Sequence, residues 1–502
     1  MPAAVLVIGL DAVESTLLGR WAGEGRLETL AHVRSSGFEI SLANQMSLLP
    51  GGIWPELNTG LSSADSGLFY HPAQIRTGEG RARPIDEGDL NPQHFYWVVA
   101  SHAERRVAVM DQVQTVVVPT FNGVQIFEWG LHDRHFAVNS NPPSLLEELR
   151  RRYGDHPVGS CDRLNRGTLK SQEELLEGLL RGIDLKTRLV LDVMDREAWD
   201  LVAATYGEAH CAGHQLWHLH DQGDPAHPIG LPPRLQTGLL EVYRKIDRGI
   251  AALVEAAGPG TSVVLIASHG MGSAIGGPDL LPEILNRLGD GAGKGARVRI
   301  ASMVPASIRS SLRSVISSDL IDRHQLGLNS RFGTIAGTGT KAIPVRNNHV
   351  GAIRLNLKGR EPNGVVDAGT EAAELIDHIR RSLLELFDPI SGQMAVEHVT
   401  TSEEAFGVSH HPDLPDLLVG FRQNIGPIRA VSSHRIGTVR RPRRPTRSGD
   451  HTAASRLWLM GTDISRGTSV QDANVLDVAP TILGLLNVPS AGWMSGKDLL
   501  RI

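Results

Sequence analysis

The sequence predicts an α/β protein with a doubly wound, mostly parallel sheet that is flanked by helices. Three observations predict this fold. Short continuous apolar runs rich in Val and Ile are typical of buried parallel strands. Helical patterns separate these runs along most of the chain, which is the order expected for parallel strands joined by crossover helices. The chain has 502 residues, of which 41% are hydrophobic, so it is long enough for a large core.

The predicted elements follow one another in the order that this fold requires. The apolar runs predict central strands at residues 4–9, 107–110, 201–206, 262–266 and 414–419. Amphipathic patterns predict helices at residues 144–152, 172–193, 235–257, 370–387 and 477–488.

Other stretches depart from this alternation. Between residues 288 and 343, Gly, Ser and Arg replace the apolar periodicity, and only 306–318 resembles a helix. We therefore expect an inserted cap or irregular region at 288–343, between a first part of the α/β core at 1–287 and a second part at 344–502. Residues 352–356 alternate like a half-buried strand. The stretch 435–447 is rich in arginine and contains prolines, which predicts an irregular exposed loop.

Composition narrows the classes of partner. Lys plus Arg is 50 and Asp plus Glu is 55, so the net charge of −5 offers no basic field for a nucleic acid polymer. No apolar run reaches the roughly 20 residues that span a bilayer. The two cysteines are too few for a disulfide framework, and no export signal is recognisable at the N-terminus, so we expect a cytoplasmic protein. A small anionic substrate would therefore have to be bound by groups at the site itself, because the protein as a whole carries no net positive charge that would attract it.

Polar residues follow several predicted strands, where a doubly wound sheet places its ligand site. Asp11 directly follows the first strand, and it suits either a divalent metal or the cap of the next helix. After the strand at 201–206, His210 and His214 share one face if the chain turns helical, a spacing that lets two imidazoles meet one ion. His269 follows the strand at 262–266, and His451 follows Gly449-Asp450.

Taken together, these residues resemble the type I phosphodiesterase and nucleotide pyrophosphatase branch of the alkaline phosphatase superfamily. The matching segments include Gly9-Leu10-Asp11, Trp54-Pro55 to Thr59-Gly60, Gly213-His214, Ser268-His269-Gly270-Met271, Gly449-Asp450-His451 and residues 476–483. The resemblance covers nearly the whole chain in order. It implies an alkaline-phosphatase-like fold, two adjacent metal ions that are usually zinc, and a Thr or Ser nucleophile at the start of a helix. It implies metal ligands at Asp11, His214, His269 and His451, and His210 is a further candidate ligand because it stands at another ligand position of the family.

Two positions depart from the family pattern. Where the family has an Asp four residues before His214, this chain has His210, and the family's Asp-His pair has become Ser268-His269. The shell is therefore less negative by two charges and less able to hold two dications. We expect His210, His214 and His451 to hold one divalent ion, zinc, with a fourth position open to water whose pKa would fall to about 7. Asp11 and His269 would form a weaker second site or an acid–base pair.

The family's nucleophile has no counterpart in residues 50–55, which contain no hydroxyl or thiol. The nearest candidates, Ser47 and Thr59, do not fit the spacing, so we assign no nucleophile. Backbone N–H groups of Gly51 and Gly52 could instead cradle an anion. We therefore expect hydrolysis of a small phosphodiester or phosphomonoester by metal-bound hydroxide.

Further residues could contact a substrate, and two alternative functions stay open. Candidate pocket residues are Trp129, His132, Asp133, Asn347, Asn348 and His349. Trp129 could equally anchor its own loop. The arginines near His451 could attract an anion, although a solvated loop is the simpler interpretation. In the first alternative, a protein of the same fold catalyses a non-phosphoryl hydrolysis or transfer in a biosynthetic pathway. In the second, the chain is a binding protein that has lost its catalytic activity.

Overall fold

The computed structural model describes residues 4–70, 72, 74–131, 135–159, 168–290, 339–441, 447–461, 464 and 472–501. The chain divides into two compact units. The first comprises Met1–Ser66, Asp86–Ala274 and Pro445–Ile502, and the second comprises Gly67–Ile85 and Ile275–Arg444. The expected cap at 288–343 lies mostly outside the described residues, as does the helix expected at 306–318, and both stay predictions.

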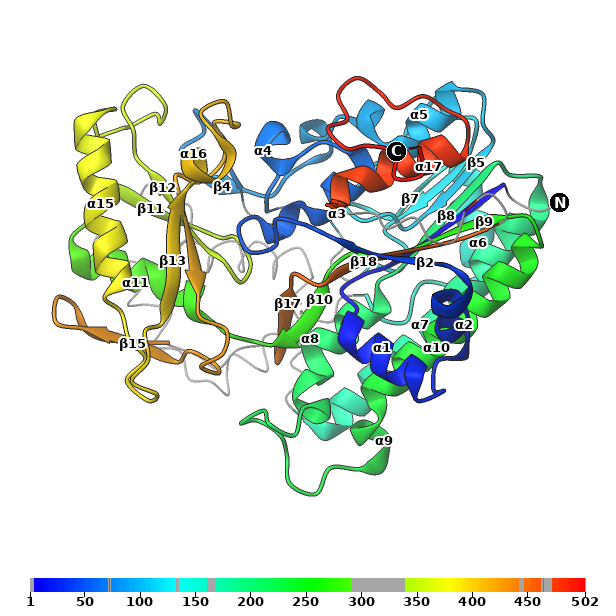
Figure 1. The fold of residues 1–502 in the computed structure, drawn as a ribbon, viewed down its shortest axis with the longest axis horizontal. Helices are drawn as coiled ribbons and strands as arrows, with labels where there is room; N and C mark the ends of the chain where they lie inside the picture. The colour runs from blue at the N-terminus through cyan, green and yellow to red at the C-terminus, as the bar shows by residue number, and fades with distance from the viewer. Residues whose placement is uncertain are drawn as a thin grey trace. The chain divides into compact units, whose positions relative to one another are not determined.

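The first unit contains an eight-stranded sheet in the order β2-β18-β9-β1-β8-β5-β6-β7 (Figure 1). Its strands are β1 Val5–Leu10, β2 Phe38–Leu42, β5 Val107–Met110, β6 Gly123–Phe127, β7 Asn139–Asn141, β8 Leu201–Tyr206, β9 Ser262–Ala267 and β18 Ser455–Met460. The run β9-β1-β8-β5-β6 is parallel, and β2, β18 and β7 are antiparallel to their neighbours. The predicted mostly parallel sheet is confirmed.

Helices cover both faces of this sheet, which is why its central strands are apolar without alternation. On β1, Leu6 and Ile8 belong to the core shared with the helices α1, α2, α6, α7, α8 and α10, whereas Val5 and Val7 belong to the core shared with α3, α5 and α17. In Figure 1, α1, α2, α7 and α10 lie below the sheet, and α3, α5 and α17 lie above it. These helices are α1 Ser15–Gly23, α2 Glu28–Ser36, α3 Ile53–Thr59, α5 Tyr96–His102, α6 Pro143–Tyr153, α7 Leu169–Arg196, α8 Glu208–His220, α10 Gly238–Ala257 and α17 Val478–Leu485.

The second unit is built on a four-stranded antiparallel sheet in the order β11-β12-β14-β13. Its strands are β11 Ala342–Val345, β12 Gly351–Leu355, β13 Val396–Thr401 and β14 Leu417–Phe421, and its helices include α11 Leu281–Leu288, α15 Thr370–Leu384 and α16 Ser402–Phe406. The small ribbons β3 Gln74–Ile75 with β4 Ala82–Arg83 and β15 Ala430–Ser433 with β16 Gly437–Arg440 complete it.

Three sequence predictions fail in this unit. Only residues 417–419 of the run at 414–419 lie in a strand, β14, which belongs to the antiparallel sheet and is not a central parallel strand, because an apolar run alone does not reveal the direction of its neighbours. The strand near 352–356 is fully buried, because Arg354 is buried against Glu361 (Nε to Oε1, 2.6 Å) and does not face water. Residues 437–440 form β16 within the predicted loop, where they pair with β15.

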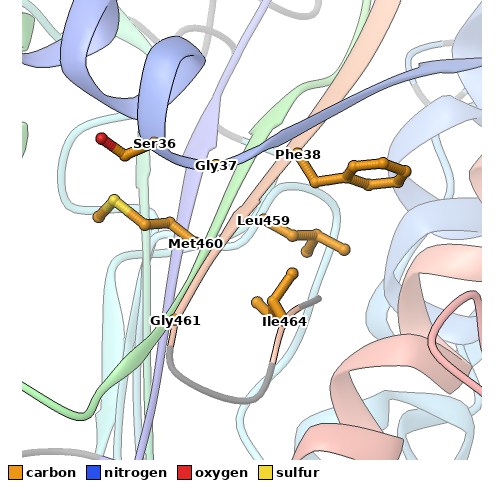
Figure 2. A pocket seen from close by; sticks show the side chains of 7 residues that line it. All are labelled: Ser36, Gly37, Phe38, Leu459, Met460, Gly461 and Ile464. Atoms are coloured by element: carbon orange, nitrogen blue, oxygen red, sulfur yellow. The ribbon is translucent and has the colours of Figure 1, made fainter. Parts of the chain in front are cut away.

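Two further features are a negative finding on membrane helices and a small pocket in the first unit. No described helix combines the length and apolar character needed to cross a membrane. Figure 2 shows a small pocket where the ends of β2 and β18 meet, lined by Ser36, Gly37, Phe38, Leu459, Met460, Gly461 and Ile464. None of these lining residues is titratable, so the pocket offers no acid, base or metal ligand.

Candidate metal centre

Polar side chains stand at the carboxyl ends of three adjacent parallel strands, β9, β1 and β8. Ser268 and His269 follow β9, Asp11 follows β1, and His210 lies one turn into α8, which begins directly after β8. All four side chains are buried. These residues therefore lie at one edge of the sheet, as the sequence predicted, and that they form a site stays a prediction.

Two of the predicted histidines share one face of α8. His210 and His214 are four residues apart on this helix, and their Nε2 atoms lie 2.8 Å apart. His214 is fully buried, and its Nδ1 lies 2.8 Å from the carbonyl oxygen of Gly449. The helix that the spacing required is thus present, and it brings both imidazoles together.

His451 reaches the same point through a short antiparallel ribbon. Strand β17 (Gly449–Thr452) pairs with β10 (Gly270–Ser273), and His451 lies opposite Met271. The Nε2 of His451 lies 2.7 Å from the Nε2 of His210. A side chain at Gly449 would overlap the carbonyl oxygen of Gly213, so only glycine lets this strand lie so close to α8.

The three imidazoles of His210, His214 and His451 form a group whose ligand atoms all lie within 4.8 Å of one another. The Nδ1 of His210 and the Nδ1 of His214 each face an acceptor, the carboxylate of Asp11 and the carbonyl of Gly449. A ring that donates from Nδ1 keeps the Nε2 lone pair as its ligand atom. Two ring nitrogens 2.7–2.8 Å apart share either a proton or a metal ion. The residues therefore fit a divalent metal ion with nitrogen ligands, as zinc prefers.

Asp11 orients His210. Its Oδ2 lies 2.6 Å from the Nδ1 of His210, and its Oδ1 accepts a hydrogen bond of 2.7 Å from the indole Nε1 of Trp54. Burial would raise the pKa of Asp11, but the charge and hydrogen bond of His210, the charge of His269 and the Trp54 donor hold it well below its usual range. Asp11 is thus an anionic partner of His210, and its direct contact with an ion stays a prediction.

Replacing Asp11 with asparagine is expected to weaken zinc binding about 10- to 100-fold, a typical effect of losing a carboxylate that orients a histidine ligand. Asparagine has one acceptor oxygen, whereas His210 and Trp54 both donate to Asp11. Competition with a chromophoric chelator measures the affinity. The control is Asp247→Asn, because Asp247 is also buried but accepts hydrogen bonds from Thr29 and Leu30 at the start of α2. Equal zinc affinity in Asp11→Asn and the wild type would contradict the assigned role.

His269 lies beside the three imidazoles. Its ring centre is 4.4 Å from that of His451, and its Nδ1 lies 3.0 Å from the hydroxyl of Ser268. The Ser268 hydroxyl also accepts a hydrogen bond of 3.3 Å from the backbone N–H of Ala12, which ties the end of β9 to the end of β1. Asp11, His210 and His269 form a second group whose ligand atoms lie close together. Whether this group holds an ion or acts as an acid–base pair stays a prediction.

The two candidate hydroxyls lie in different settings. Ser47 is exposed in a turn. Thr59 is buried at the end of α3, where its hydroxyl donates to the carbonyl of Pro55 (2.6 Å) and accepts from the N–H of Leu61 (3.1 Å). Both hydrogen bonds hold the Thr59 hydroxyl within its own turn.

Gly51 and Gly52 lie in a 3₁₀ turn, Pro50–Gly52, that leads into α3. Trp54, near the start of this helix, connects it to Asp11. The anion cradle expected from these glycines stays a prediction.

The predicted pocket residues belong to different parts of the chain. Trp129 is buried, its N–H donates to Asp111 (2.8 Å), and its indole donates to the carbonyl of Gly154 (3.2 Å), so these contacts favour the interpretation that it anchors its own loop. His132 and Asp133 lie outside the described residues. Asn347, Asn348 and His349 belong to the second unit, between β11 and β12.

Two of the arginines near His451, Arg440 and Arg441, lie in the described part of the chain. The Arg441 side chain forms an ion pair with Asp279. Arg440 ends β16, and Arg443 and Arg444 lie outside the described residues.

Sequence reasoning missed a buried charge cluster at the neighbouring strand ends. Lys186, on α7, lies 3.1 Å from Asp111 and 3.4 Å from Glu208, and its Nζ donates to the carbonyls of Gly130 and Thr205. Burial would lower the pKa of Lys186, but Glu208 and Asp111 raise it above its usual value. Asp111 follows β5 as directly as Asp11 follows β1, which was the available signal. Because Glu208 is the first residue of α8, the cluster fixes the start of this helix two residues before His210.

A mostly parallel sheet whose carboxyl edge gathers imidazoles and a carboxylate defines the class of protein as an α/β protein with a candidate site beyond the ends of its strands. The family model described as type I phosphodiesterase / nucleotide pyrophosphatase matches residues 5–453. The chain therefore belongs to this family, as its sequence motifs predicted. No curated protein sequence is detectably similar to the chain.

Solved structures share the fold at low sequence identity. Alkaline phosphatase PafA is 13% identical with a TM-score of 0.56, and the match covers 100% of this chain and 99% of that one. Phosphonoacetate hydrolase from Sinorhizobium meliloti 1021 is 12% identical with a TM-score of 0.52, covering 97% and 96%. Human ectonucleotide pyrophosphatase / phosphodiesterase 5 is 10% identical with a TM-score of 0.51, covering 98% and 97%. At these identities the similarity establishes the fold.

Proposed function

We propose that this protein hydrolyses a small phosphodiester or phosphomonoester, that His210, His214 and His451 hold one zinc ion, and that water is the nucleophile. The observation that carries the proposal is the convergence of three buried Nε2 atoms, two of them on rings whose Nδ1 atoms face fixed acceptors. Family membership supports the phosphoester class of substrate.

In this proposal three histidines bind the metal ion, and neighbouring acceptor groups orient two of their rings. When bound, a zinc ion would supply Lewis acidity to a phosphoryl oxygen and would lower the pKa of a water molecule. His210, His214 and His451 would contribute no negative charge as neutral ligands, so the site keeps a positive charge that favours an anionic ester. Asp11 keeps His210 in the tautomer with Nε2 as ligand, and the carbonyl of Gly449 does the same for His214.

Water is favoured as the nucleophile because the two candidate hydroxyls, those of Ser47 and Thr59, are poorly suited. The resemblance places the family's nucleophile just before or within residues 50–55, which have no hydroxyl or thiol. The Thr59 hydroxyl is engaged at the end of α3, and Ser47 is exposed. A direct displacement by water therefore needs no covalent intermediate.

The stereochemistry at phosphorus distinguishes the two mechanisms. Hydrolysis of a chiral phosphorothioate ester in isotopically labelled water is expected to invert the configuration, because one in-line displacement inverts phosphorus once. A covalent intermediate would involve two displacements and net retention, so retention would contradict the proposal. Metal analysis of the purified protein gives an independent check, with about one zinc per chain expected.

A further inference from the structure

A carboxylate that the sequence did not single out, Glu14, lies at the start of α1, three residues after Asp11. It is buried, with 8% of its surface exposed. Its Oε1 accepts hydrogen bonds from the N–H and the hydroxyl of Thr16, at 3.2 and 2.7 Å. Its Oε2 accepts from the N–H of Met271 at 3.0 Å and from the hydroxyl of Thr452 at 3.2 Å. One side chain therefore joins α1 to both strands of the β10–β17 ribbon.

The two ribbon contacts lie next to the candidate metal ligands. Met271 follows His269 by two residues and lies opposite His451, and Thr452 directly follows His451. A side chain at Gly270 would overlap both the Thr452 hydroxyl and the Glu14 carboxylate, so the backbone of β10 packs directly against this pair. The position of Glu14 thus determines how closely the ribbon approaches the end of β1.

Glu14 is itself held by the core of the first unit. Its backbone N–H donates to the hydroxyl of Tyr243 at 2.9 Å, and Tyr243 is buried on α10 with its ring packed edge-on against Trp21. The anchor therefore connects the ribbon to the helical layer on one face of the sheet.

We infer that Glu14 is a positioning residue that seats the β10–β17 ribbon so that His451 meets His210 and His214. The inference rests on the metal centre proposed above. Asp11 and Glu14, in one turn after β1, would then act on different ligands: Asp11 orients His210, and Glu14 places His451. An ionised carboxylate suits this task because it only accepts, and all of its described hydrogen-bonding partners are donors.

Three variants of the full-length protein test this role. Glu14→Gln keeps the volume of the side chain but replaces one acceptor oxygen with a donor amide. Thr452→Val removes one hydroxyl donor on the ribbon side of the carboxylate, and Thr16→Val removes the equivalent donor on the α1 side. The last two variants are matched, because each exchanges Thr for a side chain of similar shape and removes one hydrogen bond to Glu14.

Two measurements are made on each variant. Zinc affinity is determined by competition with a chromophoric chelator, with Zn²⁺ alone as the probe. Amide hydrogen exchange of the peptides that contain residues 270–273 and 449–452 is measured without metal, and it reports the seating of the ribbon directly, because the Met271 N–H donates to Glu14.

We expect Glu14→Gln to weaken zinc binding about tenfold. Thr452→Val should weaken it about fivefold, which is the size of effect expected from losing one hydrogen bond. Thr16→Val should change the zinc affinity less than twofold. Exchange in the ribbon peptides is expected to rise in the first two variants only. Equal effects of Thr452→Val and Thr16→Val on affinity, or faster ribbon exchange with unchanged affinity, would overturn the inference. A wild-type protein that binds no zinc would instead refute the proposed metal centre, and exchange in the ribbon would then decide whether Glu14 seats it.

Discussion

Replacing His214 with alanine is expected to lower kcat/KM for a phosphoester about a thousandfold, because metal-ion catalysis supplies several kcal/mol of transition-state stabilisation. The same variant is expected to lose its stoichiometric zinc. His214 is fully buried, its Nε2 lies 2.8 Å from that of His210, and its Nδ1 faces the carbonyl of Gly449. Its removal leaves two imidazoles, too few to complete a typical protein zinc site.

The matched control for His214 lies on the same helix. His220, near the end of α8, packs its ring against Trp21 and Trp217 at centroid distances of 5.5 and 6.1 Å. His220→Ala also deletes an imidazole from α8, so it reports the general cost of such a change. We expect this variant to keep its zinc and most of its activity. Retention of zinc and of full activity by His214→Ala would refute the proposed centre.

Replacing Glu56 with glutamine is expected to stabilise the protein by about 3 kcal/mol at pH 8 and to change stability little at pH 4.5. Glu56 is buried on α3, within the segment that links Trp54 to Thr59. Burial raises the pKa of Glu56 to about 7 from its ordinary 4.5, and a hydrogen bond from the N–H of Ser63 offsets only part of this rise.

The direction of the pH effect follows from where the proton is bound. Between pH 4.5 and 7 the folded protein keeps the Glu56 proton, whereas the unfolded chain has released it. Stability from this group is therefore fully present below pH 4.5 and is lost as the pH rises through 7. The shift corresponds to about 3 kcal/mol at roughly 1.4 kcal/mol per pKa unit. Glutamine resembles the protonated carboxyl group and carries no such penalty at high pH.

Urea denaturation at several pH values measures this difference. Glu147→Gln serves as the control, because Glu147 is exposed on α6 and its replacement should leave the pH dependence unchanged. A Glu56→Gln variant whose stability runs parallel to that of the wild type from pH 4.5 to 8 would show that Glu56 is ionised in the folded protein at a normal pKa.

Much of the first unit could be predicted because its signals are local. The apolar runs at β1, β5, β8 and β9 reflect burial on both faces, and their ends were located to within one residue. The spacing of His210 and His214 needed only a helix after β8 to bring the two rings together.

The second unit was harder because its signals depend on partners far away in the chain. Arg354 suggested a solvent-facing position, but the folded chain buries it against Glu361 and the carbonyls of Pro412 and Leu414. The run at 414–419 has the composition of a buried strand whether its neighbours are parallel or antiparallel. Only the register of β14 with β12 and β13 distinguishes the two.

The sequence by itself determined the parallel core and the family, and it singled out the histidines that gather at one edge of the sheet, because strand burial, helical spacing and motif order are local properties of the chain. The tertiary structure alone decided which ring nitrogens face one another and what orients them. Asp11 against His210, Gly449 against His214 and Glu14 against the ribbon of His451 are contacts between residues far apart in sequence. Such hydrogen bonds depend on packing geometry, which no local pattern encodes.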